Sequence, residues 1–451
     1  MLVALLIPAL WSTARVAAGE PPVFDQSRRI DAVAAVLPQR ERIEPVNRML
    51  RERLEKILPD LMRETGFDMW LVINREYAED PVFFSLVPEP VFAARRTTML
   101  VFHDRGGEEG VERLTVSRYP FGELYEAAWE GGDLDAQWRG LADLITDRDP
   151  RRIGINVSRA WPVADGLTAS LRERLAEVLE PKYAMRLEGA EKLAIRWLET
   201  RSPLELETYP NIVALARAVI GEAFSDRVIT PGVTTTEDVA WYIRQRFADL
   251  DLPIWFMPYV NRQRRGGGCD AESPFCGDSG LILRGDVLHT DVGICYLRLC
   301  TDTQEMGYVL RQGEDAPPAG LVGAINAGNR WQDLLTAEFR TGRTGNQILA
   351  SIREASSRER ILSSTYTHPL GFFGHAPGPT IGMWDDQGPT PLRGDWPLHP
   401  STAFAIEGNV KAPVSEWGGQ MVQIKLEQSA VFDGEKVTYL AGRQTEWHLV
   451  R

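Results

Sequence analysis

Apolar positions in the first part of the chain follow helical spacing and then strand-like spacing. Over residues 45–63 they recur every three or four positions, which predicts an amphipathic helix. Short β-rich runs follow at residues 69–73, 98–102 and 153–157, bounded by Gly, Asp and Arg. Helix and strand alternate, so we expect an α/β domain over residues 40–192.

A second pattern begins near residues 193–210, and we expect a second domain over residues 193–451. Thr235, with Asp238 three residues later, is typical of a capped helix start. The turn Asp433-Gly434 predicts a hairpin. The domain is therefore expected to be α+β. Its expected helices are 210–224, 239–247, 321–339 and 346–355, and its expected strands are 281–283, 287–294, 403–410, 421–432 and 437–440.

Composition indicates a globular protein and argues against nucleic-acid binding. The 451 residues are 44% hydrophobic and 25% charged, and the length favours two domains. The formal net charge is −13, which lacks the basic footprint that nucleic acid requires. The charged, glycine-rich segment 262–268 is interpreted as a solvated loop, with anion binding as the alternative.

The first eighteen residues resemble a signal peptide. Residues 2–11 are an apolar run too short to span a bilayer, and Val16-Ala17-Ala18 supplies the small residues of a cleavage site. The region before the run carries no charge, so a different start residue or a frayed apolar N-terminus is the alternative. We expect export to the periplasm or outside the cell. No membrane association is expected after cleavage.

Four cysteines lie within a short segment of the second domain. In an exported protein an even number of cysteines allows disulfides, and four cysteines allow three pairings or free thiols. They lack the CxxC pair of a zinc knuckle. The residues are Cys269, Cys276, Cys295 and Cys300.

Five residues of the second expected domain form a ligand set for two divalent metals. Four carboxylates and one imidazole suit Mn²⁺, Zn²⁺, Co²⁺ or Fe²⁺, and shared carboxylates can hold two such ions. Taken alone, a glutamate on the polar face of a strand is more often a surface residue, and a lone histidine is more often structural. The ordered set outweighs these readings and predicts a hydrolase. It consists of Asp291, Asp302, His368, Glu407 and Glu427.

Strand alternation places further candidates near this set, and the glycine-rich segment 368–375 adds a second histidine, His375. His289 shares a strand face with Asp291, because successive side chains of a strand point to opposite faces. Asp302 follows eleven residues later and would lie on the returning strand. Lys425 shares a face with Glu427 in the same way.

The motifs around these residues resemble those of the pita-bread metallopeptidases, which include aminopeptidase P, prolidase and methionine aminopeptidase, with creatinase as a metal-free relative. Each motif alone is weak, but their order and spacing are specific. The resemblance implies a pita-bread catalytic domain preceded by an α/β creatinase-type domain. The motifs are GDVLHTDVG (285–293), CTDT (300–303), HPLGFFGH (368–375), AIEGN (405–409) and QIKLE (423–427).

The resemblance also implies roles for the matched residues. Asp291 would chelate the first metal, Asp302 and Glu427 would bridge both, and His368 and Glu407 would complete the second. The cofactor would be two divalent ions, with Mn²⁺ as the first choice, and a hydroxide between them would be the nucleophile. Glu407 would also shuttle a proton.

A second histidine, His375, would hydrogen-bond the substrate carbonyl or the tetrahedral intermediate. The expected partners are a short peptide substrate and at most a second copy of the chain.

Three departures from the family pattern suggest a divergent branch. The family's further histidine before the first aspartate strand is missing, since no histidine lies between His103 and His289. Lys425 replaces the usual arginine, which keeps the charge but loses bidentate geometry. Thr303-Gln304 stands where Thr-Arg is usual. His289 is a candidate substitute for the missing histidine, against a packing role, so His289 and Lys425 are the expected substrate-binding residues.

These observations favour a metal-dependent peptidase of the Xaa-Pro aminopeptidase or prolidase type. The missing histidine keeps a second interpretation open, hydrolysis of a non-peptide amide or C–N bond on the same metal centre. A third is a binding module that keeps the fold without catalysis; such modules usually lose ligands, and this chain retains all five.

Overall fold

The computed structural model describes residues 36–107, 109–119, 121–273 and 275–451. The expected signal peptide at residues 1–18 lies outside the described residues. Among the described helices, none is both long and apolar enough to cross a bilayer.

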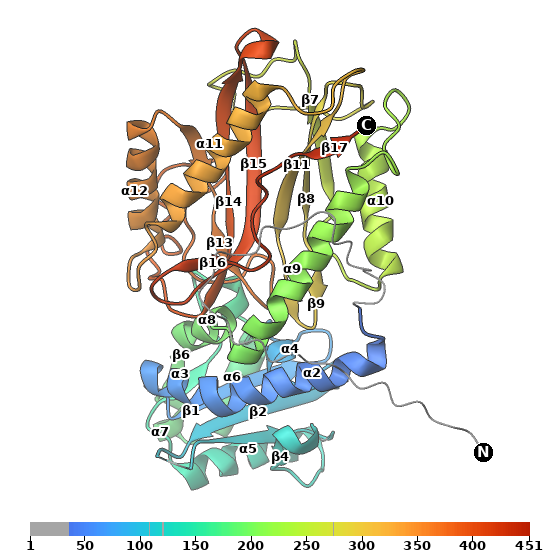
Figure 1. The fold of residues 1–451 in the computed structure, drawn as a ribbon. Coiled ribbons are helices and arrows are strands. Elements are labelled where there is room, and N and C mark those ends of the chain that lie inside the picture. Colours follow the sequence, from blue (N-terminus) through green and yellow to red (C-terminus); the bar gives the residue numbers. More distant parts are fainter. Residues whose placement is uncertain (1–35, 108, 120, 274) are drawn as a thin grey trace, which may run out of the picture.

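The first half of the described chain is built on a six-stranded sheet with the order β4-β3-β2-β1-β5-β6 (Figure 1). β1 is buried along both faces: Trp70 and Val72 pack into one apolar cluster, and Met69 and Leu71 into another. Helices therefore cover the sheet on both sides, which is why β1 is a continuous apolar run. The strands are β1 (Met69–Arg75), β2 (Thr97–Asp104), β3 (Val111–Val116), β4 (Glu126–Ala127), β5 (Ile153–Ile155) and β6 (Leu187–Gly189).

The helices of this half include the one predicted over residues 45–63. It is continuous but changes pitch, since the π-helical segment Arg53–Ile57 joins α2 to α3. Figure 1 shows α2 lying across the boundary between the two halves of the molecule. The helices are α2 (Gln39–Glu52), α3 (Leu58–Thr65), α4 (Phe83–Leu86), α5 (Leu134–Arg148), α6 (Ala169–Val178), α7 (Pro181–Ala184) and α8 (Glu191–Glu199).

The second half contains a nine-stranded sheet. Six strands follow the order β12-β14-β15-β11-β8-β7, while β13 pairs with β14, β16 with β15 and β17 with β11. A separate small hairpin joins β9 (Cys295–Tyr296) and β10 (Leu299–Cys300). The nine strands are β7 (Tyr259–Gln263), β8 (Val287–Val292), β11 (Thr303–Val309), β12 (Leu362–Thr365), β13 (His368–Leu370), β14 (Thr402–Val414), β15 (Gln420–Phe432), β16 (Val437–Tyr439) and β17 (His448–Val450).

Two pairs of helices pack against this sheet (Figure 1). α9 (Pro203–Ala223) and α10 (Thr236–Asp249) share an apolar cluster with β8, while α11 (Ala319–Thr336) and α12 (Gly345–Arg358) share another with β14 and β15. α9 starts earlier than predicted because Ser202, the residue before it, forms a capping box with Glu205 in its first turn. The predicted capping box of Thr235 and Asp238 is confirmed.

The predicted strand at 281–283 is wrong. Leu281 forms only an isolated bridge with Thr235, and the backbone of Ile282 bonds to Gly232 and Thr234 in the turn before α10. The segment thus pairs with a turn instead of extending β8. In addition, Arg262 of the predicted loop 262–268 belongs to β7.

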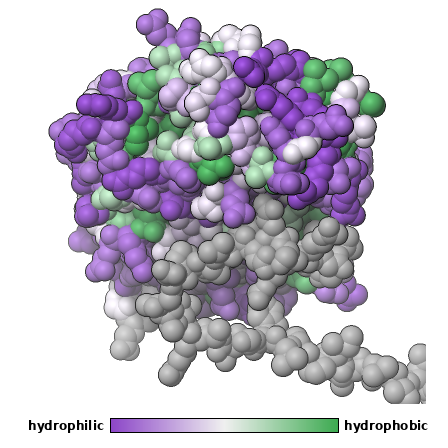
Figure 2. All heavy atoms as spheres, turned by 45° about the horizontal axis from the view of Figure 1, so that its top comes forward, coloured by the Kyte–Doolittle hydropathy of each residue, from purple (hydrophilic) through white to green (hydrophobic). Residues whose placement is uncertain are grey.

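The surface seen in Figure 2 is mostly hydrophilic, with hydrophobic residues in small separate patches. Scattered exposed apolar residues are normal for a folded protein and need no binding partner to explain them. The site described next lies in a cavity instead.

Candidate metal and substrate site

The register of the large sheet places four polar side chains and one aromatic side chain in a single row. Glu407 on β14 pairs with Glu427 on β15, and Glu427 pairs with Gln304 on β11. Gln304 in turn pairs with Asp291 on β8, and Asp291 pairs with Tyr259 on β7. Residues far apart in the sequence thus become direct neighbours.

All five candidate metal ligands lie together at this row. The Nε2 atom of His368 is 3.6 Å from Asp302 Oδ2, 3.8 Å from Glu407 Oε2 and 3.9 Å from Glu427 Oε1. Three groups of three have donor atoms close enough to share one ion, and two of these groups contain Glu427. These two are Asp291 with Asp302 and Glu427, and His368 with Glu407 and Glu427, while the third is Asp302 with His368 and His375.

His368 has the tautomer that a metal ligand needs. Its Nδ1 lies 3.1 Å from the carbonyl oxygen of Pro369, which can only accept a hydrogen bond, so Nδ1 carries the proton. The Nε2 lone pair therefore faces the carboxylates. A backbone carbonyl that orients a ligating histidine in this way is a common support for metal sites.

Several buried atoms of the cluster have no hydrogen-bond partner among the described residues. Buried polar atoms are normally bonded, so unpartnered ones that converge on one point fit a divalent cation. They are Asp291 Oδ1, Asp302 Oδ1, Glu427 Oε1 and His368 Nε2.

Burial and mutual repulsion disfavour the charged form of the carboxylates. Burial raises the pKa of Asp291 to about 7. Burial, followed by the charges of neighbouring carboxylates, raises the pKa of Asp302 and of Glu427 well above their usual values. The pKa of Glu407 is also raised well above its usual value, first by burial and then by the charge of Asp291. Bound cations would offset this repulsion.

Gln304 connects the two glutamates to His289. Its Nε2 lies 2.7 Å from Glu407 Oε1 and 3.0 Å from Glu427 Oε2, while its Oε1 lies 2.8 Å from His289 Nε2. Gln304 thus engages one oxygen of each glutamate. The other two oxygens, Glu407 Oε2 and Glu427 Oε1, are those near His368.

A cavity of about 390 Å³ opens in front of this row. Its lining includes the hydrogen-bonded side chains of Gln304 and His289, and also Lys425. Burial lowers the pKa of Lys425 to about 7, and its Nζ lies 3.5 Å from the centre of the Phe275 ring. Much of the remaining wall is aromatic: Trp255, Phe256, Tyr259, Phe275, Tyr366 and Trp384.

Trp255 holds His375 in this wall. A Cβ at Gly293 or at Gly374 would lie about 2 Å from the indole of Trp255, so both positions require glycine. The indole Nε1 donates to the Thr301 carbonyl at 2.9 Å, and the ring lies 4.9 Å from that of His375. The two glycines of the sequence motifs therefore make room for a tryptophan.

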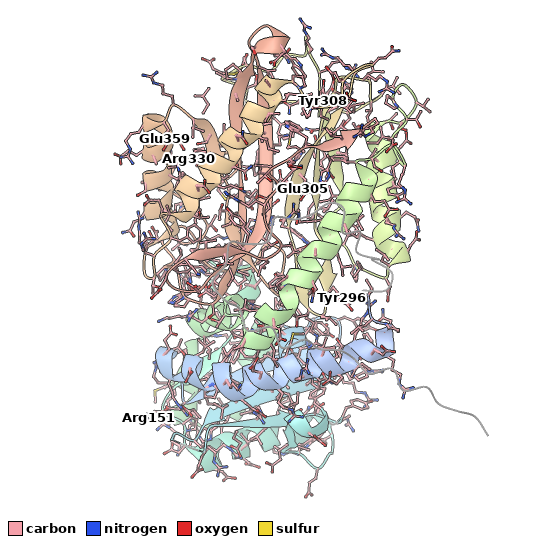
Figure 3. The ribbon with its side chains drawn as sticks, in the orientation of Figure 1. Arg151, Tyr296, Glu305, Tyr308, Arg330 and Glu359 are labelled. Carbon is pink, nitrogen blue, oxygen red and sulfur yellow. A yellow bond between two sulfur atoms is a disulfide. The ribbon has the colours of Figure 1, made fainter. Side chains whose placement is uncertain are left out.

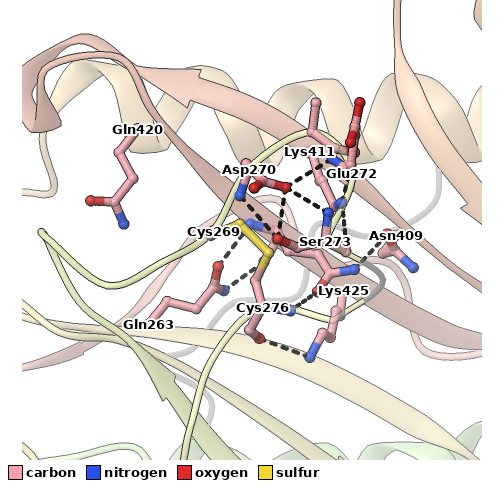
Figure 4. The surroundings of a disulfide bond; sticks show 12 residues. Gln263, Cys269, Asp270, Glu272, Ser273, Cys276, Asn409, Lys411, Gln420 and Lys425 are labelled. Atoms are coloured by element: carbon pink, nitrogen blue, oxygen red, sulfur yellow. Dashed lines mark hydrogen bonds between the residues drawn. A yellow bond between two sulfur atoms is a disulfide. The ribbon is translucent and has the colours of Figure 1, made fainter.

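A disulfide between Cys269 and Cys276 closes the loop that carries Phe275 (Figure 4). The backbone N–H of Cys276 donates to Gln423 Oε1 at 2.8 Å, and Lys411 Nζ donates to the Ala271 carbonyl at 3.0 Å. The other pair, Cys295 with Cys300, closes the small hairpin. The structure thus selects one of the three pairings that the sequence allowed.

Comparisons with known proteins agree with this architecture. No family model matches the sequence, and no curated protein matches it at the level of sequence. Solved structures do match: the X-Pro aminopeptidase of Thermotoga maritima has a TM-score of 0.61 at 17% identity, covering 87% of this chain and 100% of that chain. The Xaa-Pro dipeptidase of Bacillus anthracis has a TM-score of 0.57 at 16% identity, covering 91% and 100%.

The chain has the pita-bread fold. A dipeptidase of Mycobacterium ulcerans shares it, with a TM-score of 0.55 at 16% identity over 93% of this chain and 99% of that chain. Identities this low show the fold alone. The expected α+β pita-bread architecture is confirmed, whereas the domain limits and the roles of the site residues stay predictions.

The structure brings every predicted site residue to one place. Asp291, His289 and Lys425 line the cavity with His375 and Glu407, and Asp302, His368 and Glu427 complete the cluster. From the sequence, Gln304 was noted only as a departure from the family pattern, and the aromatic wall was overlooked. The dense aromatic residues at 255–259 were an available signal for that wall.

Proposed function

We propose that this protein is a metal-dependent hydrolase that cuts short peptides, of the Xaa-Pro aminopeptidase or prolidase type. The observation that carries the proposal is that two of the three candidate ligand groups share Glu427. A shared carboxylate is the arrangement that two neighbouring ions need. Four of the five ligands offer carboxylate oxygens, which favours Mn²⁺, with Zn²⁺, Co²⁺ or Fe²⁺ as the alternatives.

Two divalent ions, when bound, would polarise the scissile carbonyl and supply an activated water at neutral pH. Asp291 would hold one ion, His368 and Glu407 the other, with Asp302 and Glu427 between them. Glu407 would also take a proton, and its Oε2, which Gln304 leaves unengaged, supports that role. His375 faces the same cavity and would donate a hydrogen bond to the substrate carbonyl oxygen. The aromatic wall would bind side chains and exclude water.

The test is metal content together with product analysis. The mature protein is loaded with Mn²⁺, Zn²⁺ or Co²⁺ and incubated with a mixed peptide library, and products are identified by mass. We expect about two ions per chain, as a two-metal site requires, and cleavage near peptide N-termini. The Asp291→Ala variant should lose both the bound metal and the cleavage activity, whereas a variant of an exposed residue, Glu354→Gln, should keep both. Wild-type protein that binds no divalent ion would refute the proposal.

A second candidate is hydrolysis of a non-peptide amide or C–N bond at the same site. The loop before β8 presents Phe275 and no histidine to the cavity, which favours a substrate different from that of the usual peptidases. Cleavage of amide metabolites without cleavage of any di- or tripeptide would support it. Metal binding without any hydrolysis would favour a binding module.

We also propose that the protein is exported and works in an oxidising compartment. Two disulfides support this, because such bonds persist mainly outside the cytosol. Fractionation of expressing cells, with detection in the periplasm or medium, tests it.

A further inference from the structure

His289 and Gln304 form a hydrogen-bonded pair that the metal-ligand roles do not use. His289 lies on β8 two residues before Asp291 and is almost completely buried, yet it contributes to the cavity wall. Its Nε2 contacts Gln304 Oε1 at 2.8 Å, and Gln304 Nε2 contacts both Glu407 and Glu427.

The positions of the protons in these hydrogen bonds follow from the chemistry of each group. With metal ions bound, both glutamates are ionised and can only accept hydrogen bonds, so the amide nitrogen of Gln304 must face them. Its carbonyl oxygen then faces His289 and also can only accept. Nε2 of His289 therefore carries the proton, and in the neutral ring Nδ1 is left with a lone pair.

That lone pair has no donor among the described residues. Nδ1 of His289 is buried and without a hydrogen-bond partner, although the Tyr259 ring lies nearby, with its centre 6.3 Å from that of His289. A buried acceptor left unbonded is costly, so a merely packed position would favour an apolar residue. An unpartnered acceptor on a side chain of the cavity wall fits a ligand that supplies a donor.

We propose that Gln304 holds His289 as its Nε2–H tautomer, so that Nδ1 accepts a hydrogen bond from an N–H group of the substrate. The ligand class is an amine or amide N–H. This assignment rests on the proposed function and deepens it. His289 becomes a substrate-binding residue and Gln304 its positioning residue.

Two variants at position 289 separate this role from an indirect one. His289→Phe removes both ring nitrogens, while the shorter His289→Asn loses the contact with Gln304 but keeps an amide oxygen near the place of Nδ1. We expect KM for a dipeptide to rise about tenfold in His289→Phe, as for one lost hydrogen bond, and to be largely restored in His289→Asn. The rise in KM should exceed the fall in kcat, and Mn²⁺ binding measured by calorimetry should be unchanged.

If His289 acted only by orienting Gln304 and the glutamates, the two variants would share one defect, seen in kcat and in Mn²⁺ affinity. That result would overturn the proposal. Comparing a free dipeptide with its N-acetylated form identifies the donor. A larger KM effect on the free dipeptide indicates the amine, and equal effects indicate an amide N–H.

A measurement without turnover keeps the two proposals separable. In ¹⁵N-histidine-labelled wild-type protein, with His289→Asn used to assign the signal, Nδ1 of His289 should have the chemical shift of an unprotonated nitrogen. A protonated Nδ1 would refute the inference even if peptides are cleaved. If no peptide is cleaved, the proposed function fails, and binding of the uncleaved dipeptide to Mn²⁺-loaded wild type and His289→Phe still tests the role of His289.

Discussion

At the scale of single residues, Gly374 has no side chain and so leaves room for Trp255, which positions the candidate catalytic residue His375. Gly374→Ala would place a methyl group about 2 Å from the indole of Trp255, which packs against His375. We expect kcat to fall about 10- to 100-fold, because small displacements of reacting groups have effects of that size. Metal content should be kept. Gly323→Ala on α11, where the new methyl group meets no atom within 4 Å, is the control and should leave kcat unchanged.

The buried carboxylates predict an unusual pH dependence for metal-free protein. Burial raises the pKa of Asp291 in the folded state from 3.8 to about 7, so folding favours the protonated form. The stabilisation is complete below about pH 4 and is lost as the pH rises to about 7. Thermal unfolding in a chelator should show wild type losing stability relative to Asp291→Asn over this interval. A constant difference between the two proteins would contradict the prediction, and bound metal should diminish the effect.

At the scale of elements, α10 depends on the cap that its sequence predicted. The Thr235 hydroxyl oxygen accepts a hydrogen bond from the Asp238 backbone N–H, and the Asp238 carboxylate accepts one from the Thr235 backbone N–H. Thr235→Ala should lower the free energy of unfolding by about 1 kcal/mol, measured by urea denaturation. Thr235→Ser keeps the hydroxyl and should retain most of that stability. Equal losses in both variants would show that the cap contributes little.

The loop between β7 and β8 depends on its disulfide in a different way. Replacing both Cys269 and Cys276 by Ser frees a loop whose cysteines are seven residues apart. The expected loss of stability is about 2 kcal/mol, from the greater freedom of the unfolded chain. Because Phe275 belongs to the cavity wall, KM should rise more than kcat falls. Steady-state kinetics with unchanged metal content checks this, and an unchanged KM would show that the wall persists without the bond.

At the scale of the whole molecule, Arg53 ties the two halves together. It lies where the helix changes pitch, and its Nη1 donates to the Thr200 carbonyl at 2.6 Å and to Glu205 Oε2 at 2.7 Å. Arg53→Lys keeps the charge but loses the forked geometry, so we expect a loss of about 3 kcal/mol by urea denaturation. The half-exposed Arg51→Lys should change stability by less than about 0.5 kcal/mol. Similar small losses in both variants would contradict a role for Arg53 at the junction.

A second buried ionic group braces the large sheet on the face opposite the candidate metal ligands. Glu305 on β11 lies beside α9 in Figure 3 and pairs with Arg217 of that helix and His448 of β17. Burial alone would raise the pKa of Glu305. The charges of its partners, Arg217 first among them, outweigh burial and lower the pKa of Glu305 to about 2. Glu305 is therefore charged in the folded protein and holds the C-terminal strand to the sheet. Its neighbour Gln304 points to the opposite face, into the site, as strand alternation requires.

Local patterns in the sequence were sufficient for most elements and for the identity of the candidate ligands. Spacing predicted the helices at 321–339 and 346–355 and the strands around Asp291 and Glu427, because periodicity depends only on neighbouring residues. It failed at 281–283, where an apolar run pairs with a turn instead of a strand. The short strand β17 was also overlooked, since its existence depends on β11.

The sequence by itself determined which chemical groups are present: four carboxylates, two histidines in a glycine-rich segment, and four cysteines. Only the tertiary structure decided how they combine. It selected the cysteine pairing, put Gln304 between two glutamates and His289, and placed Trp255 against two distant glycines. The reason is physical: the contacts of Gln304 with the two glutamates and of Trp255 with the glycines join residues far apart in the chain, so sheet register and packing set their distances. The cysteine pairs are close in sequence, but which cysteines meet depends on how the loop and the small hairpin fold, and spacing alone left three pairings open.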